Sequence, residues 1–501
     1  MATMTALQAP VQAPSNPFTT LPLETNQNIA SLIEYDTDLC SFRLICRTTN
    51  DAVDADSCSF WRRRFLEHFE RPVGESSLWK GVEGNLRFRN EYKKRRGCLK
   101  NGARFVSGET RRERECLEVV RGLVVDSFSE HNPTDNDGSE DKIYESINMT
   151  HLLRFLRVNN ILNIFEPPKK KPSRFTTSTR RTDRSSTTPQ QPSLLLRTLQ
   201  VLGAPMLLSF EPHLLNRHYA YPDSQILVYS TATTHPIFHG CYGLDVNMEF
   251  VLHNLNFWKY HMLREAEATL FYAFQDLEDY ERPRWWDGKL GQAGVLGRKW
   301  KGSYAYVNRE EIVAVRAGRG EDEQIQDEFA GEDQAFTFQD MQLQLVDDSP
   351  WPEVFERHLS SLNGPRGRGA FTRAQTRTTP ANEIAHLKHR SFRFEGEGQD
   401  VTEQFLASGW LNALPKQSGI PGWQRMTMMK YFEDEESGVV DEGALWAYEG
   451  VVVPGGNVVV GRWWCPNEGV EGGEVYSGPF LLSCVDGPGD GVQGGEGEGG
   501  A

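Results

Sequence analysis

The chain has 501 residues and a formal net charge of -15 at pH 7, and this acidic balance argues against a surface that follows nucleic-acid phosphates, since such a surface needs clustered lysine and arginine. Its hydrophobic content of 38% is enough for a sizeable core, and its length predicts about two to four domains. The eight cysteines include no Cys-x-x-Cys pair, which disfavours a zinc ribbon, a disulfide framework and a redox motif, so we expect no metal site and no cofactor.

Residues 1–17 are rich in Pro, Ala, Ser and Thr and show no periodicity, so they are expected to be a disordered lead. They contain no basic region followed by an apolar segment, and no later stretch approaches the about 20 apolar residues that cross a membrane. We therefore expect an intracellular protein, cytoplasmic or nuclear or both, without a membrane partner.

Residues 18–70 contain three short helical patterns, which follow Leu21-Pro22, begin at Asp38 and begin at Phe60. At helical spacing, Leu39 and Phe42 share one stripe, while Leu44 points almost the opposite way. A block of about 45 residues buries too little area to be comfortably stable alone. Another protein is therefore expected to cover its outward apolar residues, and the alternative is that all three helices belong to the core of a larger domain.

This block resembles the F-box, a motif that runs as Leu-Pro-x-Glu, an Ile/Leu-rich helix, Asp-Leu, an apolar residue, Arg-Leu-x-Cys-Arg and a closing aromatic residue plus Arg. The matching residues are Leu21, Pro22, Glu24, Ile29, Leu32, Ile33, Asp38, Leu39, Phe42, Arg43, Leu44, Cys46, Arg47, Trp61 and Arg62. The chain departs from the motif at Thr25, where Ile or Leu is usual, and in the polar run Asn26-Gln27-Asn28.

The resemblance implies a three-helix domain that docks to the Skp adaptor, which links F-box proteins to a cullin in an SCF ubiquitin ligase. The residues that it implies for adaptor binding are Leu21, Pro22, Glu24, Ile29, Leu32, Leu39, Phe42, Leu44, Cys46, Arg47 and Trp61.

Two segments are expected to join this block to the rest of the chain. Residues 71–165 show helical patterns interrupted by the acidic stretch "SEHNPTDNDGSED", which predicts a helical connector with an acidic loop. Residues 166–193 carry basic, Ser, Thr and Pro residues with almost nothing to bury, as in a disordered linker. The basic runs at 93–96 and 169–171 are interpreted with equal weight as nuclear import signals or as solubilising charge.

Residues 194–486 are predicted to form a mainly antiparallel β barrel or sandwich, so the fold class is α+β with several domains. Ser193 is expected to cap a short helix, "LLLRTLQVL", and "SPWPEVFERHLSSLNG" is expected to form another. Pro454-Gly455-Gly456 is typical of a type II turn. The expected strands are "QILVYS", "NMEFVLH", "EATLFYAF", "KGSYAYV", "EIVAVRAG", "AFTFQDMQLQLV", "QRMTMMKYF", "ALWAYEGVVV", "NVVVGRWW" and "GPFLLSCV". Residues 487–501 are expected to be a flexible glycine-rich tail.

The distal region also looks like the long C-terminal region of a group of fungal F-box proteins. The resemblance lies in "WKGSYAYVNREEIVAVR", "SGIPGWQRMTMMKYF", "ALWAYEGVVVPGGNVVVGRWWCP" and "YSGPFLLSCVD". This resemblance supports the expected architecture, but it does not identify a substrate.

Candidate catalytic and metal-binding patterns are weak. His235 and His239 have helical spacing, but Pro236 argues against a helix, and the pair His386 and His389 has no third ligand nearby. No Gly-x-Ser-x-Gly or His-Glu-x-x-His motif is present. We therefore expect a protein that is not an enzyme and has no catalytic residue.

Recognition of a target is expected on the hairpin that ends in "RWW". Neighbouring residues of a strand face opposite sides, so one tryptophan of the pair can enter the core while the other borders an open surface, where an Arg can anchor a partner. The expected target-binding residues are Arg462, Trp463, Trp464, Trp446 and Tyr448, at the border of a partly exposed groove. The alternative is that these aromatic residues fill the β core.

Together these features predict a substrate-receptor subunit of an SCF-type ubiquitin ligase, whose F-box docks the Skp adaptor, and through it a cullin, while the β domain binds an unidentified protein destined for degradation. The alternative is a small-ligand-binding or enzymatic β-barrel that is tethered through its F-box. A deep aromatic pocket would favour this alternative, and a packed interior would oppose it.

Overall fold

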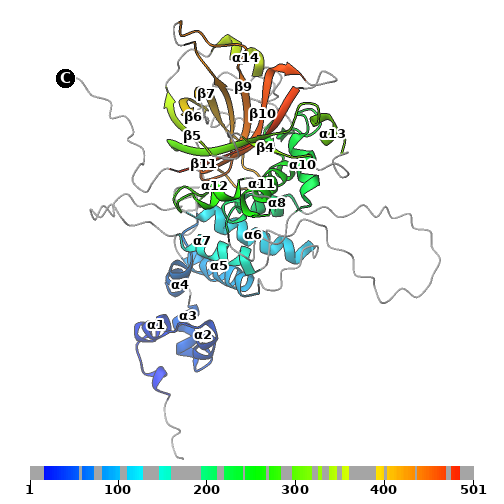
Figure 1. Cartoon of the computed structure of the whole chain (residues 1–501). Helices are drawn as coiled ribbons and strands as arrows, with labels where there is room; N and C mark the ends of the chain where they lie inside the picture. The colour runs from blue at the N-terminus through cyan, green and yellow to red at the C-terminus, as the bar shows by residue number, and fades with distance from the viewer. Residues whose placement is uncertain are drawn as a thin grey trace, which may run out of the picture.

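The computed structural model of the chain describes residues 16–55, 59–72, 82–101, 110–127, 146–158, 193–210, 219–240, 243–266, 270–283, 296–318, 325–329, 338–346, 352–359, 391–399, 403–434, 437–469 and 475–485. Figure 1 shows these residues in layers, with a small group of helices at one end, two further layers of helices, and a β barrel at the other end. Most of the predicted disordered lead (1–17), most of the predicted linker and the glycine-rich tail lie outside the described residues, and η1 begins at Pro17 within the predicted lead.

The N-terminal group contains one helix more than the three that the sequence predicts. Its elements are a 3-10 turn η1 (Pro17–Thr19), α1 (Leu23–Ser31), α2 (Asp36–Arg43), α3 (Arg47–Asp54) and α4 (Phe60–His68). The polar sequence of α3 hid this helix, because only Thr49, Ala52 and Val53 of it are buried. Thr49 closes its N-terminus by accepting a hydrogen bond from the Cys46 amide at 3.1 Å.

The second layer contains α5 (Val82–Asn101), α6 (Thr110–Asp126) and α7 (Ile147–Val158), all within the range 71–165, and the predicted acidic loop lies outside the described residues. Leu123 of α6 belongs to the apolar cluster of the N-terminal helices. Val120 and Val124 of the same helix belong to the large cluster that continues into the barrel. Helix α6 therefore contributes residues to both apolar clusters.

The third layer corrects the predicted secondary structure. It contains α8 (Leu194–Leu202), α9 (Ala204–Leu207), β1 (Phe238–His239), β2 (Asp245–Val246), α10 (Tyr221–Tyr229), α11 (Met248–Leu263), α12 (Phe271–Gln275) and α13 (Ile312–Arg316). The predicted strands "QILVYS", "NMEFVLH" and "EIVAVRAG" are wrong, since they lie in α10, α11 and α13, and the described end of "EATLFYAF" lies in α12. Every residue of α11 except Glu249 and Tyr260 is buried, so its sequence shows no polar face from which a helix could be recognised.

The predicted β domain is a closed barrel and not a sandwich. Eight strands pair antiparallel in chain order, and β11 pairs with β3 to close the ring. They are β3 (Lys299–Tyr306), β5 (Gln339–Val346), β6 (Ser391–Gln399), β7 (Gln404–Ala413), β8 (Gln424–Tyr431), β9 (Trp446–Val452), β10 (Val458–Gly469) and β11 (Val475–Cys484). A short strand, β4 (Glu328–Phe329), also pairs with β3, and α14 (Glu353–Leu359) contains part of the second predicted helix.

The two faces of the barrel strands differ in their residue types. Along β5, buried and exposed residues alternate, which separates an inner face from an outer one. The inner face contains aromatic rings in contact, such as Tyr448 with Phe480 at 5.1 Å between ring centroids. Glycines make room for these rings: a Cβ at Gly461 would lie 2.6 Å from a carbon of Phe480. Aromatic rings packed against glycines therefore fill this part of the interior.

The hairpin between β9 and β10 has the predicted turn. The Gly456 amide donates to the Val453 carbonyl at 3.0 Å, and Gly455 has a φ of +99°. A positive φ at the third residue defines a type II turn, and only glycine adopts it without strain.

Candidate functional site

Large apolar side chains are exposed on the N-terminal helices, far from the barrel (Figure 1). The most exposed are Leu32, which ends α1, and Leu44, which ends α2, with 85% and 86% of their surface accessible. We call the exposed set the docking face, and it consists of Leu23, Leu32, Tyr35, Leu44 and Ile45. Exposed apolar residues gathered in so short a stretch make this surface a candidate binding site.

The structure divides the residues expected to bind the adaptor into three groups. Pro22, Glu24, Leu32, Leu44 and Arg47 are exposed, and Leu21, Ile29 and Cys46 are half-buried. Leu39, Phe42 and Trp61 are buried among the helices, with Leu39 only 2% exposed. These three side chains stabilise the helical group from inside, so the surface offered to a partner is narrower than the motif suggests.

Asp36 holds the docking face on the layer beneath it. Its carboxylate accepts hydrogen bonds from Tyr92 Oη at 2.7 Å and from Arg96 Nε at 3.1 Å, both on α5, and Arg64 Nη2 of α4 lies 3.4 Å away. Burial alone would raise the pKa of Asp36, but these hydrogen bonds outweigh it and hold the pKa below its usual value. Arg64 also donates to the carbonyl of Ile33 at 2.8 Å, beside the docking face.

The basic run at 93–96 lies inside α5 and has structural partners. Arg95 is buried and bonds to Asp126 of α6 at 2.5 Å and to Glu91 at 3.0 Å. Arg96 is bound to Asp36. Two of the four basic residues are thus engaged in the fold, which argues against their use as a nuclear import signal, since an importin needs them accessible. The run at 169–171 lies outside the described residues.

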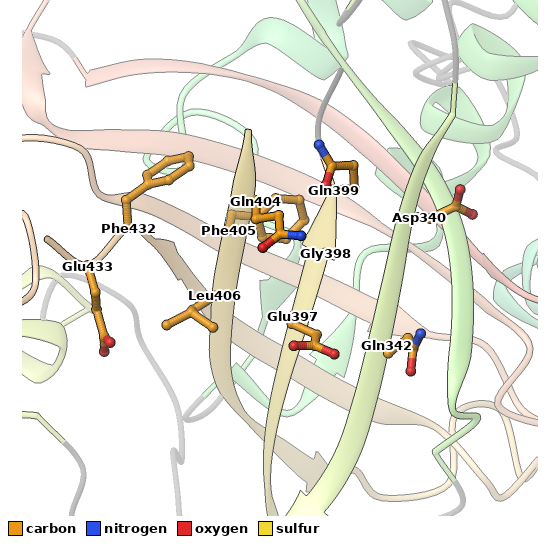
Figure 2. Close-up of a pocket in the computed structure, with 10 residues that line it drawn as sticks. All are labelled: Asp340, Gln342, Glu397, Gly398, Gln399, Gln404, Phe405, Leu406, Phe432 and Glu433. Carbon is orange, nitrogen blue, oxygen red and sulfur yellow. The ribbon is translucent and has the colours of Figure 1, made fainter. Parts of the chain in front are cut away.

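A cavity of about 430 Å³ opens at one rim of the barrel (Figure 2), on β5, β6 and β7, which none of the described helices covers at this rim. We call it the rim groove. Its lining residues are Asp340, Gln342, Glu397, Gly398, Gln399, Gln404, Phe405, Leu406, Phe432 and Glu433. Figure 2 shows that these side chains come from three neighbouring strands and from the segment that follows β8.

The strand register brings the polar side chains of the rim groove together. Glu397 of β6 lies between Gln342 of β5 and Leu406 of β7, and Gln399 lies between Asp340 and Gln404. The lining contains three carboxylates and three amides but no basic residue. Lys301 pairs with Asp340 at 2.7 Å, whereas Glu397 and Glu433 have no ion-pair partner within the described residues.

Apolar residues form the inner side of the rim groove. Phe405 is buried, and its ring packs where a Cβ of Gly398 would be. The ammonium group of Lys430, also buried, lies 4.2 Å from the centroid of the Phe405 ring. The same ammonium group lies 5.5 Å from the ring of Tyr304 and 5.9 Å from that of Phe432, so aromatic side chains surround a cation at this end of the interior.

The structure corrects the expected exposure of the target-binding residues. Arg462 is 3% exposed, because α11 covers this part of the outer face: its guanidinium group lies 4.8 Å from the ring of Phe250 and donates to the His235 carbonyl at 3.1 Å. Burial lowers the pKa of Arg462 to about 10. Arg462 is therefore not the exposed surface anchor that the sequence predicted, and it stabilises the packing of α11 on the barrel.

The four aromatic residues that were grouped with Arg462 are mostly buried as well. Trp463 lies inside the barrel, where its indole nitrogen donates to the Ala305 carbonyl at 3.0 Å. Tyr448 is also interior, and Trp464 packs on the outer face against Phe355 of α14. Trp446, 5.2 Å from Trp463 between ring centroids, is half-buried. The alternative, that these residues fill a large β core, is the one the structure supports.

A serine, a histidine and a carboxylate do meet in the third layer, but not as an active site. Ser224 Oγ lies 3.0 Å from His253 Nδ1, and His253 Nε2 lies 3.8 Å from Glu249. Ser224 has no accessible surface and also accepts a hydrogen bond from Asn256. A nucleophile must be accessible to its substrate, so this network is structural.

Other candidate patterns remain without support as sites. His235 contributes its backbone carbonyl to Arg462, and His386 and His389 lie outside the described residues. Among the residues that the structure describes, no group of three His, Cys, Asp or Glu side chains is placed to hold a metal ion. None of the described helices has the length and apolar character needed to cross a membrane.

The rim groove and part of the docking face were not predicted from the sequence. In β5, exposed polar residues alternate with buried ones along "QDMQLQ", and this alternation was the available signal for an uncovered outer face. It gave no indication of which strands are neighbours. Tyr35 and Leu23 were missed because the motif does not include them.

Comparisons of this chain with family models, with curated proteins and with solved structures find no match in any of the three.

Proposed function

We propose that this protein is the substrate-receptor subunit of an SCF-type ubiquitin ligase, with the docking face bound to the Skp adaptor and the barrel end holding the protein to be modified. The exposure of Leu32 and Leu44 is the observation that carries the proposal. Both residues belong to the F-box pattern, and both lie at the ends of helices in a group with few residues of its own.

The energetics of the docking face favour a partner. Burying a leucine side chain stabilises a complex by about 1.5–3 kcal/mol. In the chain alone, Leu32 and Leu44 gain little of this free energy, because more than four fifths of the surface of each residue is exposed to water. The helices that carry them are held by Asp36 and Arg64, so little conformational entropy is lost on docking.

The layered architecture suits a receptor. The docking face and the barrel lie at opposite ends of the molecule (Figure 1), and α6 packs against the apolar clusters of both ends. A target at the barrel would therefore be held at a fixed distance from the adaptor. In this proposal the ligase partners supply the chemistry, and the chain itself contributes binding only.

The alternative function, a barrel for a small ligand, has the closed eight-stranded barrel in its favour. The contacts between interior rings oppose it: Trp463 lies 5.4 Å from Tyr476 and 5.2 Å from Trp446. These side chains occupy the space in which such a ligand would lie.

Titration of the purified Skp adaptor into the full chain tests the proposal. We expect binding by the wild type, and a loss of about a hundredfold or more in affinity for the double variant Leu32→Ala, Leu44→Ala, because both side chains lose contact area in the complex. The double variant Leu86→Ala, Leu194→Ala removes two exposed leucines elsewhere and should bind like the wild type.

Unchanged affinity of a folded Leu32→Ala, Leu44→Ala variant would reject the docking face as the adaptor site. Leu39→Ala is unsuitable as a probe of docking, since this buried leucine contributes to the fold and its truncation costs about 2–5 kcal/mol of stability.

A further inference from the structure

The rim groove has the composition of a site for a positively charged chain segment. It combines three carboxylates, three amides and the apolar side chains of Phe405, Leu406 and Phe432, in a cavity of about 430 Å³. We infer that the rim groove binds a basic peptide segment of a partner protein, with lysine or arginine side chains on Glu397 and Glu433. This inference rests on the proposed function in one respect, that the partner would be the target of the ligase.

The charges of the groove leave two carboxylates for a ligand. Lys301 lies 2.7 Å from Asp340 and 3.5 Å from Glu281, so Asp340 is neutralised within the protein. Glu397 and Glu433 have no such partner within the described residues. They lie on β6 and just after β8, with β7 between them, so a ligand that reaches both must cross β7.

The residue between them suits the stem of a long basic side chain. Leu406 of β7 is the direct register partner of Glu397 and also of Tyr431, two residues before Glu433. Lysine and arginine pack their methylene groups on apolar surface while the charged end reaches a polar group. Carboxylates beside a leucine provide both contacts, and Gln342, Gln399 and Gln404 can bond to the backbone of a peptide.

Two other classes of ligand fit less well. A metal ion needs several ligands within a small sphere, and no suitable group of three His, Cys, Asp or Glu side chains occurs in the described part of the chain. A sugar is usually held by stacking on an open aromatic face, whereas the Phe405 ring is buried between Gly398 and Lys430. A basic peptide needs neither feature.

The location of the groove agrees with a protein ligand. The outer faces of β5 and β6 carry the exposed residues Asp340, Gln342 and Glu397, whereas α11 and α14 cover the outer faces of β10 and of β8 to β10. A partner can therefore approach this side of the barrel without moving a helix. The groove lies on β5, β6 and β7, and Figure 1 shows these strands at the end of the molecule away from α1 and α2, so adaptor and peptide can be bound together.

Fluorescence anisotropy on the full chain tests the inference. The probe is a short fluorescein-labelled peptide with two arginines flanking a leucine, and the comparison peptide has glutamates in place of the arginines. We expect the arginine peptide to bind, the glutamate peptide not to bind, and the affinity to fall as salt is added. The double variant Glu397→Gln, Glu433→Gln should lose about three- to tenfold in affinity, because two exposed ion pairs are removed.

A matched control keeps the test specific. Glu310→Gln, Glu311→Gln removes two exposed carboxylates outside the cavity lining and should bind the arginine peptide like the wild type. Equal affinity of wild type and the Glu397→Gln, Glu433→Gln variant, or equal binding of both peptides, would overturn the inference. Binding of maltotriose that is insensitive to salt and lost in that variant would overturn it in favour of a sugar site.

The failure of this inference can be told from failure of the proposed function. Glu397→Gln, Glu433→Gln leaves the docking face intact, so its affinity for the Skp adaptor should equal that of the wild type. If the wild type binds the arginine peptide but no adaptor, the groove is a peptide site and the ligase role is rejected. If it binds the adaptor but not the peptide, the inference is rejected and the ligase role stands.

Discussion

Leu39 and Leu44 lie on the same short helical segment and have opposite environments. The first is 2% exposed and packs in the apolar cluster with Phe42 and Phe65, and the second is almost fully in water. Their positions follow from helical spacing, which the sequence already showed. Spacing alone left open which of the two faces was the core, and the packing of Leu39 in the N-terminal apolar cluster shows that its face is the core.

Arginines of this chain show the same dependence on context. The sequence suggested an open surface around Arg462, beside two tryptophans, yet α11 covers this residue. Arg425 is likewise buried, and it pairs with Glu449 across neighbouring strands. A charged residue on a strand suggests, from the sequence alone, that its side of the strand faces solvent. Only the structure shows that a helix packs over that side and buries the charge.

At the scale of single residues, the variant Asp36→Asn tests whether the hydrogen bonds of Asp36 stabilise the helices that carry the docking face. The folded state lowers the pKa of Asp36, so the stabilisation is fully present above the usual carboxyl pKa of about 3.9 and is lost as the pH falls through the lower folded-state value. We expect the free energy of unfolding of Asp36→Asn to be about 1–2 kcal/mol lower than that of the wild type at pH 7, since charged hydrogen bonds are weakened. As the pH falls into the acid range, the variant should lose less stability than the wild type does.

Denaturant unfolding followed between pH 2 and pH 7 measures both effects. Asp38→Asn is the control, because Asp38 also lies in the first turn of α2 but is exposed and approaches only the Thr37 hydroxyl. If both variants gave the same stability at every pH, Asp36 would have no special role.

Among the elements, β8 to β11 were predicted as strands, and the turn at Pro454 between β9 and β10 has a specific chemistry. Helices α10 and α11 were predicted as strands. Every residue of α11 except Glu249 and Tyr260 is buried, and an apolar run of this kind carries no helical period. The polar outer residues of β5 and β6 were visible in the sequence, but the rim groove was not. It depends on β6 lying between β5 and β7 in register, and pairing over such distances is set by closure of the barrel.

Close packing of β9, β10 and β11 is an element-scale property that Gly461→Ala tests. The added Cβ would lie 2.0 Å from the Glu449 carbonyl oxygen and 2.5 Å from the Gly450 Cα, both backbone atoms that cannot turn away. We expect a loss of about 1–3 kcal/mol or more in the free energy of unfolding.

Gly97→Ala serves as the control for the same change in residue type. Its Cβ would meet nothing within 4 Å, and it lies within α5, so alanine should raise stability by about 0.5–1 kcal/mol. Thermal unfolding of both variants gives the comparison. A Gly461→Ala protein as stable as the wild type would show that the three strands can move apart.

At the scale of the whole molecule, the described helices and strands form a continuous body between two candidate binding surfaces. The core cluster of the barrel extends through α11 and α8 to α7 and α6, and α6 also contributes Leu123 to the N-terminal cluster. The sequence predicted a helical block, a helical connector and a β domain in this order. It did not show that α11 of the third layer is a helix, because nearly every residue of α11 is buried and its sequence has no polar face.

Hydrogen–deuterium exchange of the full chain, with and without the purified Skp adaptor, tests the central claim most directly. Slower exchange of the amides of α1 and α2, and of the segment 44–46 between α2 and α3, is the result we expect, because the adaptor would cover Leu32 and Leu44 and restrict opening of these helices. The barrel strands should exchange as in the free protein. Unchanged exchange throughout, or protection confined to β5, β6 and β7, would contradict a role of the docking face in binding the adaptor.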